Sequence, residues 1–233
     1  MSAPVVAIVN PRAAGGRTVR RWEVYAAAIR ARGLELETRT TERPEHATEL
    51  ARAALRGGAR TVVAVGGDGT ANEVANGFFD GDAAVNPEAK LAIVPIGTGG
   101  DLQRTLQLPT EPDAVAAALA AGRTRSLDIV RLRLIGHDGA PVERRFVNLA
   151  SFGMGGDVSI RAKHCWLTRR SGKLAFLWAT FSVFFRYSGK TVRLRLDEAP
   201  DELEFAVTNV ALGNGRYHGG GMQPCPLARL DDG

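Results

Sequence analysis

A chain of 233 residues, of which 45% are hydrophobic, can bury a core without disulfides and suits one large or two small domains. Its two cysteines define no disulfide framework, and its four scattered histidines show no paired metal-ligand spacing, so a zinc site is not expected. The 30 basic residues are nearly all arginine and give a net charge of +5. Genomic base composition also produces such a skew, so we expect no nucleic-acid partner.

The first half of the chain alternates strand-like apolar runs with helical patterns. The first run follows Met1 to Pro4 without a charged leader, so we expect no secretory signal and a cytoplasmic location. Regular alternation predicts an α/β fold with a parallel sheet covered on both faces, whose ligands bind beyond the carboxyl ends of the strands. In chain order, the patterns predict strands at 5–9, 34–39, 61–65 and 91–95, and helices at 18–31, 44–55, 70–78, 100–106 and 111–120.

The pattern changes near residue 126. Several of the later runs alternate polar and apolar residues, which is typical of antiparallel strands with one wet face. We therefore expect an α/β domain at residues 1–125 and a mainly antiparallel, β-rich domain at residues 126–233. The later runs lie at 127–135, 145–151, 191–197 and 203–212, with one helical insertion at 172–187.

Three glycines surround one carboxylate at residues 66–70 (Gly-Gly-Asp-Gly-Thr), directly after a predicted strand. Glycine lets backbone N–H groups come close to an anion, and the positive end of the following helix points the same way. Asp68 would repel a bare phosphate, so its presence favours Mg²⁺ between the two. A plain strand-to-helix turn capped by Asp68 or Thr70 is the alternative.

Similar turns follow other predicted strands. Asn10-Pro11 supplies a side-chain amide, and residues 97–101 (Gly-Thr-Gly-Gly-Asp) supply a hydroxyl and a second carboxylate. Three consecutive glycines at 219–221 weaken any strand and indicate close approach of backbone or ligand. We expect these segments and the glycine loop to form one site.

An apolar run at residues 174–185 follows a basic segment. The run is too short to span a bilayer. It fits either a helix of the core or an amphipathic surface that meets anionic lipid through its basic flank. The basic residues are Arg161, Lys163, Arg169, Arg170 and Lys173.

Together these motifs resemble the lipid kinase family that contains diacylglycerol kinase catalytic domains, sphingosine kinases and their bacterial relatives. The resemblance covers nearly all of the chain, from Asn10-Pro11 and the glycine loop to residues 95–98 (Pro-Ile-Gly-Thr), 148–157 and 214–233. It implies an N-terminal nucleotide-binding domain and a β-rich domain, with ATP, Mg²⁺ and a lipid meeting in the cleft. It also implies peripheral contact with a membrane surface.

The resemblance further implies roles for individual residues. Asp68 would organise Mg²⁺ and the triphosphate, and Asp128 matches an aspartate beside the catalytic metal. A structural metal loop matches Arg229, through its carbonyl, and Asp232, through its side chain. Thr41 matches a threonine that contacts nucleotide, although the adjacent Thr40 could serve instead. The nucleotide-binding residues implied are Asn10, Thr41, Gly66, Gly67, Asp68, Gly69, Thr70, Ala71, Asn72, Gly97 and Thr98.

Two departures from the family pattern bear on activity. Gly100 stands where the family usually has an asparagine, so a contact from that amide is lost. Relatives continue past the equivalent of Gly233 through strands that supply a further metal-loop carbonyl and a glutamate thought to act as general base. No residue here matches that glutamate, so we expect binding of ATP and Mg²⁺ with weak or absent kinase activity.

Two other functions stay open at the level of sequence. A kinase of a soluble substrate, of the NAD kinase type, shares the glycine loop, and a non-catalytic nucleotide- or lipid-binding module needs no base. The apolar run at 174–185 favours a lipid acceptor over a soluble one. Charge and spacing decide neither which lipid is used nor the oligomeric state, for which a homodimer is an open alternative.

Overall fold

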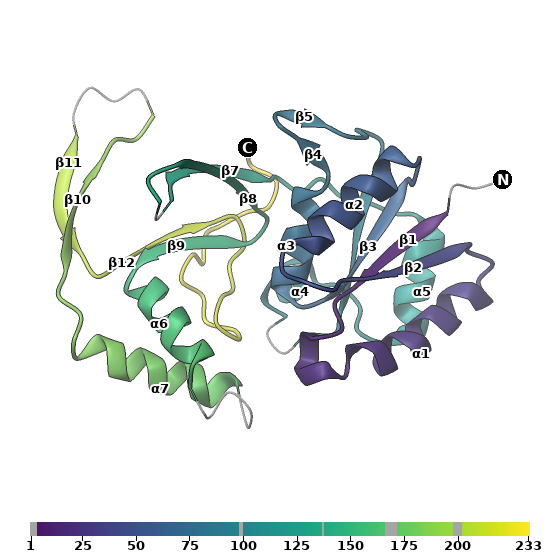
Figure 1. Cartoon of the computed structure of the whole chain (residues 1–233), viewed down its shortest axis with the longest axis horizontal. Helices are drawn as coiled ribbons and strands as arrows, with labels where there is room; N and C mark the ends of the chain where they lie inside the picture. Colours follow the sequence, from purple (N-terminus) through teal and green to yellow (C-terminus); the bar gives the residue numbers. More distant parts are fainter. Residues whose placement is uncertain (1–3, 98–99, 137, 166–171, 198–201) are drawn as a thin grey trace. The chain divides into compact units, whose positions relative to one another are not determined.

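The computed structural model describes residues 4–97, 100–136, 138–165, 172–197 and 202–233 (Figure 1). By their internal contacts the residues form two compact units. The first unit comprises Met1–Asn148 and Asn214–Gly233, and the second unit comprises Leu149–Gly213.

A parallel sheet forms the centre of the first unit. Among the described residues it has four strands in the order β2-β1-β3-β6. The two inner strands are short runs of valine, alanine and isoleucine, which can be buried on both faces. This confirms the expected α/β fold. The strands are β1 (Val5–Val9), β2 (Leu36–Thr40), β3 (Thr61–Gly66) and β6 (Lys90–Pro95).

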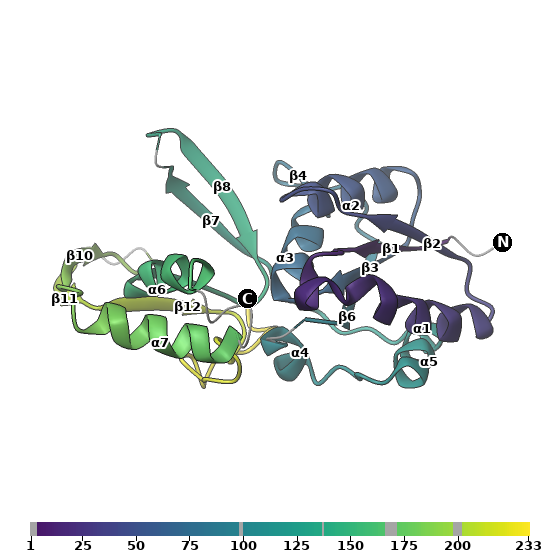
Figure 2. The ribbon, with the colours of Figure 1, turned by 60° about the horizontal axis from the view of Figure 1, so that its bottom comes forward.

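Helices cover both faces of this sheet (Figure 2). Successive strand residues point to opposite faces, so Val6 and Ile8 pack with α2 and α3, whereas Val5, Ala7 and Val9 pack with α1 and α5. The helices begin and end within two residues of the predicted positions. They are α1 (Thr18–Ala31), α2 (His46–Arg56), α3 (Asp68–Asn76), α4 (Asp101–Leu106) and α5 (Pro112–Ala121), with a short 3-10 turn η1 (Ala13–Gly16) before α1.

The first unit also contains two antiparallel strand pairs and the last residues of the sequence. The chain returns to it at Asn214, whose side-chain amide donates to the carbonyl oxygens of Asp128 and Val147 at 2.8 and 2.9 Å. The expected division at residue 125 therefore differs from the structure, because residues 126–148 and 214–233 belong to the first unit. The pairs are β4 (Phe79–Asp80) with β5 (Ala83–Ala84), and β7 (Val130–Ile135) with β8 (Pro141–Phe146).

The second unit combines antiparallel strands with two described helices, where one helical insertion was expected. The unexpected helix, α6, begins with Met154-Gly155-Gly156, and glycine is a poor helix former, so its sequence gives a weak helical signal. No helix among the described residues of the chain is long and apolar enough to cross a membrane. The elements are β9 (Leu149–Gly153) paired with β12 (Asn209–Gly213), β10 (Lys190–Leu194) paired with β11 (Leu203–Val207), α6 (Met154–Lys163) and α7 (Gly172–Phe184).

Candidate functional site

The glycine loop lies at the carboxyl end of β3, where β3 ends at Gly66 and α3 begins at Asp68. It touches the turn that follows β6, since a Cβ on Gly97 would lie 2.5 Å from the Cα of Gly67. A Cβ on Gly66 would lie 2.5 Å from the hydroxyl oxygen of Thr70. Close packing of the two turns therefore requires Gly97, and the fold of the glycine loop against Thr70 requires Gly66. At Gly69, by contrast, a Cβ would meet nothing within 4 Å, so this backbone is open to a ligand.

Asp68 connects the glycine loop to α4. One carboxylate oxygen accepts the backbone N–H of Asp101 at 3.0 Å and the other accepts that of Leu102 at 3.2 Å, so the side chain caps the start of α4. Burial raises the pKa of Asp68, the two N–H donors oppose that rise, and the nearby Asp101 adds to it. The capping role considered from sequence is thus present, but the capped helix is the next one along the chain.

Asp101 supplies the second carboxylate noted in the sequence, to which the sequence analysis assigned no individual role. Only 4% of it is exposed. One carboxylate oxygen accepts from the Arg104 guanidinium at 2.8 Å, and the other accepts the N–H of Gly220 at 2.9 Å. Gly219, Gly220 and Gly221 all have positive φ, at 65°, 87° and 115°, which favours glycine at each position. The close approach expected from this glycine run is therefore made to a carboxylate of the protein itself.

Asn10 and Thr41 reach the same end of the sheet. Asn10 follows β1, and its side-chain amide donates to the Thr70 hydroxyl at 3.1 Å. Thr41 follows β2, is 8% exposed, and donates its N–H to the carbonyl of Val9 at 2.9 Å. The structure thus brings Asn10, Thr41 and the glycine loop to the carboxyl ends of three neighbouring strands. Thr98 lies outside the described residues.

Ala71 and Asn72 belong to the packing of α3. Ala71 is 1% exposed, and the side-chain oxygen of Asn72 accepts the N–H of Val147 at 3.2 Å. The Asn72 side chain therefore fastens α3 to the segment after β8.

Asp128 lies beside the last residues of the sequence. It donates its N–H to the carbonyl of Leu230 at 2.7 Å, and its carboxylate accepts the N–H of Gly233 at 2.8 Å. Arg229 and Asp232 are in the same segment, and Arg229 forms a long ion pair of 3.9 Å with Asp231. The structure thus places Asp128 next to the expected metal loop.

The acidic groups suit a metal ion that arrives with phosphates. Among the described residues, no three or more Asp, Glu, His or Cys side chains gather closely enough to hold a metal. Mg²⁺ keeps several waters and is usually held by one or two carboxylates together with substrate phosphates. Asp68 and Asp101, which lie next to each other at the glycine turns, fit that pattern.

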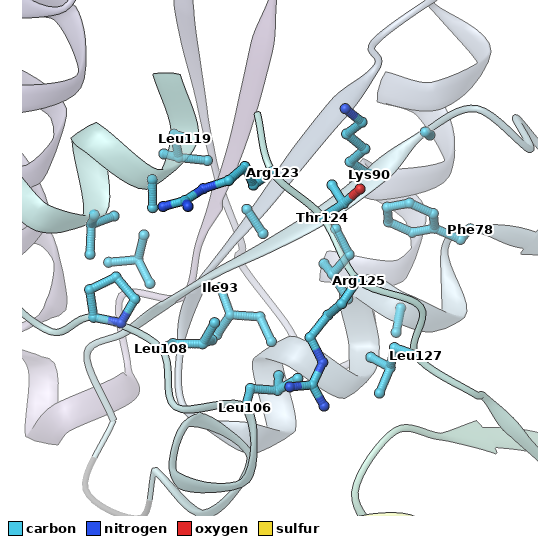
Figure 3. A pocket seen from close by; sticks show the side chains of 18 of the residues that line it. Phe78, Lys90, Ile93, Leu106, Leu108, Leu119, Arg123, Thr124, Arg125 and Leu127 are labelled. Atoms are coloured by element: carbon cyan, nitrogen blue, oxygen red, sulfur yellow. The ribbon is translucent and has the colours of Figure 1, made fainter. Parts of the chain in front are cut away.

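An apolar cavity of about 500 Å³ lies elsewhere in the first unit (Figure 3). It runs along β6 and is lined mainly by aliphatic side chains such as Ile93, Leu106 and Leu119, with Arg123 and Arg125 beside them. None of the candidate nucleotide or metal residues lines it. The cavity is therefore separate from the glycine-loop site.

Comparison with known proteins agrees with this arrangement. Residues 4–132 match the model of the diacylglycerol kinase catalytic domain, and residues 148–233 match that of the YegS C-terminal NAD kinase beta sandwich-like domain. A probable lipid kinase YegS-like protein of Pseudomonas aeruginosa strain UCBPP-PA14 is 34% identical over 98% of this chain and 69% of its own length. Its counterpart in Stenotrophomonas maltophilia is 30% identical over 97% of this chain and 70% of its own length.

Solved structures support the fold. A diacylglycerol kinase crystal structure from Bacillus anthracis str. Sterne superposes with a TM-score of 0.69 and 23% identity, covering 99% of this chain and 70% of that one. This likeness concerns the fold alone. On the family model and the relatives together, the chain belongs to the lipid kinase family defined by the diacylglycerol kinase catalytic domain and the YegS-like proteins.

Proposed function

We propose that this protein transfers the γ-phosphoryl group of ATP to the hydroxyl of a diacylglycerol-like lipid, with Mg²⁺ as the metal. The observation that carries the proposal is the convergence of Asn10, Thr41 and the glycine loop at one end of the sheet, in a member of the lipid kinase family. The lipid acceptor is supported by the relatives, which are probable lipid kinases.

The donor would bind at the glycine loop. The open backbone at Gly69 and the amino end of α3 offer N–H groups and positive dipole charge to phosphates. Phosphoryl transfer depends mainly on positioning and on stabilising charge, so a rigid loop of this kind supplies most of what the donor needs. Asn10 and Thr41 would border the nucleotide.

Mg²⁺ would be held between the phosphates and the neighbouring carboxylates Asp68 and Asp101. When bound, it would neutralise charge on the β- and γ-phosphates. Arg229 and Asp232 are proposed as a second, structural metal loop, and Asp128, which neighbours that loop, is proposed to lie beside the catalytic metal.

The acceptor would be reached at a membrane surface. One side of α7 exposes large apolar residues at helical spacing, with exposed fractions of 56% for Leu174, 53% for Leu177 and 57% for Phe181. The opposite side packs through Ala179 and Val183 in the core of the second unit. A helix that is apolar on both sides suits contact with lipid at its exposed side.

The test is phosphotransfer from radiolabelled ATP to a mixed lipid extract in detergent, with the products separated by chromatography. Because no residue matches the general-base glutamate, we expect at most a weakly labelled phospholipid, whose labelling requires Mg²⁺ and is lost in Asp68→Ala. NAD is the comparison acceptor, because an NAD kinase-type enzyme would label NAD instead. Nucleotide binding without any labelled product would favour a non-catalytic binding module.

Asp113→Ala is a matched control for the assay. It also removes one carboxylate from the first turn of a helix, but from the exposed start of α5. Its nucleotide affinity should equal that of the wild type. If both variants lost the same amount of nucleotide affinity, the assignment of Asp68 to the donor site would be contradicted.

A further inference from the structure

A pocket of about 390 Å³ opens between α6 and α7 in the second unit. The two helices pack against each other, and they lie side by side in both views (Figures 1 and 2). The pocket has aliphatic lining from Ile160 and Val183. Its polar lining residues are Asp157, Arg161, Ser182, Arg186 and Tyr187.

Arg161 lies in this pocket without an acceptor for its buried nitrogen. Its guanidinium carbon lies 5.2 Å from the centre of the Trp178 ring. Its Nε is inaccessible to solvent and has no hydrogen-bond partner among the residues that the structure describes. Asp157, one turn earlier on α6, forms no ion pair with it among the described residues. A buried guanidinium N–H without an acceptor is costly, which indicates an acceptor from outside the chain.

A second arginine shares the pocket. Arg186 follows the end of α7, is exposed, and forms no side-chain hydrogen bond or ion pair with a described residue. Two guanidinium groups against one carboxylate leave the pocket positive. Ser182 and Tyr187 add hydroxyl donors beside them. This set of donors suits a phosphate group, which arginine can bind through two parallel hydrogen bonds.

The pocket borders the apolar side of α7. Trp178 carries the Arg161 guanidinium over its ring and is itself 44% exposed. It shares the exposed side of the helix with Leu174, Leu177 and Phe181, and Phe185, just before Arg186, is 80% exposed. Tryptophan next to arginine, between an apolar surface and a polar pocket, is typical of the headgroup level of a membrane.

We propose that Arg161 and Arg186 bind the headgroup phosphate of an anionic glycerophospholipid while the exposed side of α7 enters the bilayer surface. The inference rests on the proposed function, because it places the lipid kinase at its membrane. The charge of the pocket selects the occupant, since a bilayer of anionic lipid offers phosphates beside acyl chains. A second copy of the chain would have to supply acidic groups for the same pocket.

Vesicle sedimentation without nucleotide tests the proposal. Phosphatidylcholine vesicles with and without phosphatidylglycerol are compared for the wild type, Arg161→Gln, Arg186→Gln and the lysine variants at both positions. We expect each glutamine variant to lower the affinity for anionic vesicles about tenfold, as for a charge-assisted hydrogen bond. The lysine variants should recover only part of it, because lysine lacks the planar fork.

Arg193→Gln is the matched control. Arg193 lies on β10 of the same unit, is exposed, and its loss changes the net charge equally. It should weaken binding by no more than about fivefold, the effect of one diffuse charge at a membrane. Equal losses of affinity for anionic vesicles at all three positions, or full recovery of that affinity in the lysine variants, would overturn the proposal. Either result would indicate diffuse electrostatic attraction to the membrane.

Two further experiments distinguish a lipid headgroup from other occupants of the pocket between α6 and α7. Glycerol 3-phosphate in excess should leave vesicle binding nearly unchanged, and strong competition would make the pocket a site for a soluble phosphate. Self-association in lipid-free sedimentation that Phe181→Gln abolishes would make the occupant a second copy.

Because Arg186 is exposed, its variants keep the test valid if those of Arg161 unfold. Phosphotransfer without selective vesicle binding overturns this inference alone, whereas binding without phosphotransfer counts against the proposed function.

Discussion

At the scale of single residues, the glycines of the site have two different tasks. Gly66 and Gly97 let backbone and side chain pack where a Cβ would collide, whereas Gly69 faces open space. The sequence alone does not distinguish these two kinds of glycine. Substitution by alanine can therefore separate the glycines that hold the fold from one that leaves room for a ligand.

Gly97→Ala is expected to destabilise the first unit. The added Cβ would lie 2.5 Å from a backbone carbon, so one of the two turns must shift. Overpacking of this kind costs about 1–3 kcal/mol of unfolding free energy, measured by urea denaturation. Gly69→Ala is the control: it should leave stability unchanged or raise it by up to about 1 kcal/mol, while lowering ATP affinity. Equal destabilisation by both would contradict the division of tasks.

Asp68 is expected to make stability depend on pH. Because burial raises its pKa, the folded state holds this proton more tightly than the unfolded state. Unfolding free energy should therefore fall as the pH rises from the ordinary aspartate value through the raised one. Asp68→Asn lacks this step, so its stability relative to the wild type should rise across the same window and then stay level.

The measurement is urea unfolding of both proteins over a pH series, with a chelator present so that no metal binds the carboxylate. The asparagine retains only one acceptor oxygen for the two N–H groups of α4, which adds a constant cost of about 0.5–2 kcal/mol. Only the pH-dependent part of the difference tests the burial of Asp68. Parallel curves would show that its pKa is the same in the folded and unfolded states.

At the scale of elements, the sequence predicts the α/β half closely and the rest coarsely. Apolar runs at strand length and helical periods at 18–31 and 44–55 are local signals, and they give the sheet and its helices. The return of the chain at Asn214 is a contact between residues 86 positions apart, for which no local pattern exists. In α6 a local signal exists but is misleading, because the glycine pair has poor helix propensity and tertiary packing overrides it.

The site shows the same limit. Asn10 and the glycine loop are predictable because each follows a strand, whereas Thr41 was implied only by the family resemblance. The link from Asp101 to Gly220 joins distant segments, although Asp101 stands in the glycine-rich stretch 97–101 and its carboxylate was a visible signal. Sequence reasoning connected that stretch to phosphate, and the structure connects it to Asp68 and the triple glycine.

Asn214→Leu tests how the returning chain is held. Asn214 is 5% exposed, and its amide serves two carbonyl oxygens that no leucine can satisfy. Leaving buried acceptors unpaired should lower the unfolding free energy by about 1–3 kcal/mol. Asn86→Leu is the matched control, since its side-chain NH2 donates only one long bond, of 3.4 Å to the carbonyl of Ala59, and its oxygen accepts the exposed N–H of Glu88 at 3.1 Å. A loss no greater than that of the control would mean that other contacts anchor residues 214–233.

At the scale of the whole molecule, nucleotide binding should appear as stability. A ligand that binds only the folded state stabilises it by mass action, by about 2.7 kcal/mol at a free concentration of one hundred times Kd. We expect ATP with Mg²⁺ to raise the urea midpoint of the wild type, and ATP with a chelator to raise it much less, because no metal ion then offsets the repulsion between the phosphates and the carboxylates of Asp68 and Asp101.

Two comparisons make this outcome specific. Asp101→Asn removes one of the two carboxylates and should reduce the difference between the metal and chelator conditions, whereas Arg193→Gln on β10 should leave it intact. NAD at the same concentration should give no stabilisation if the site is built for a triphosphate. Equal stabilisation by NAD and ATP would instead indicate that the glycine loop binds nucleotides in general. The loop could then hold NAD as the phosphate acceptor and not only ATP as the donor.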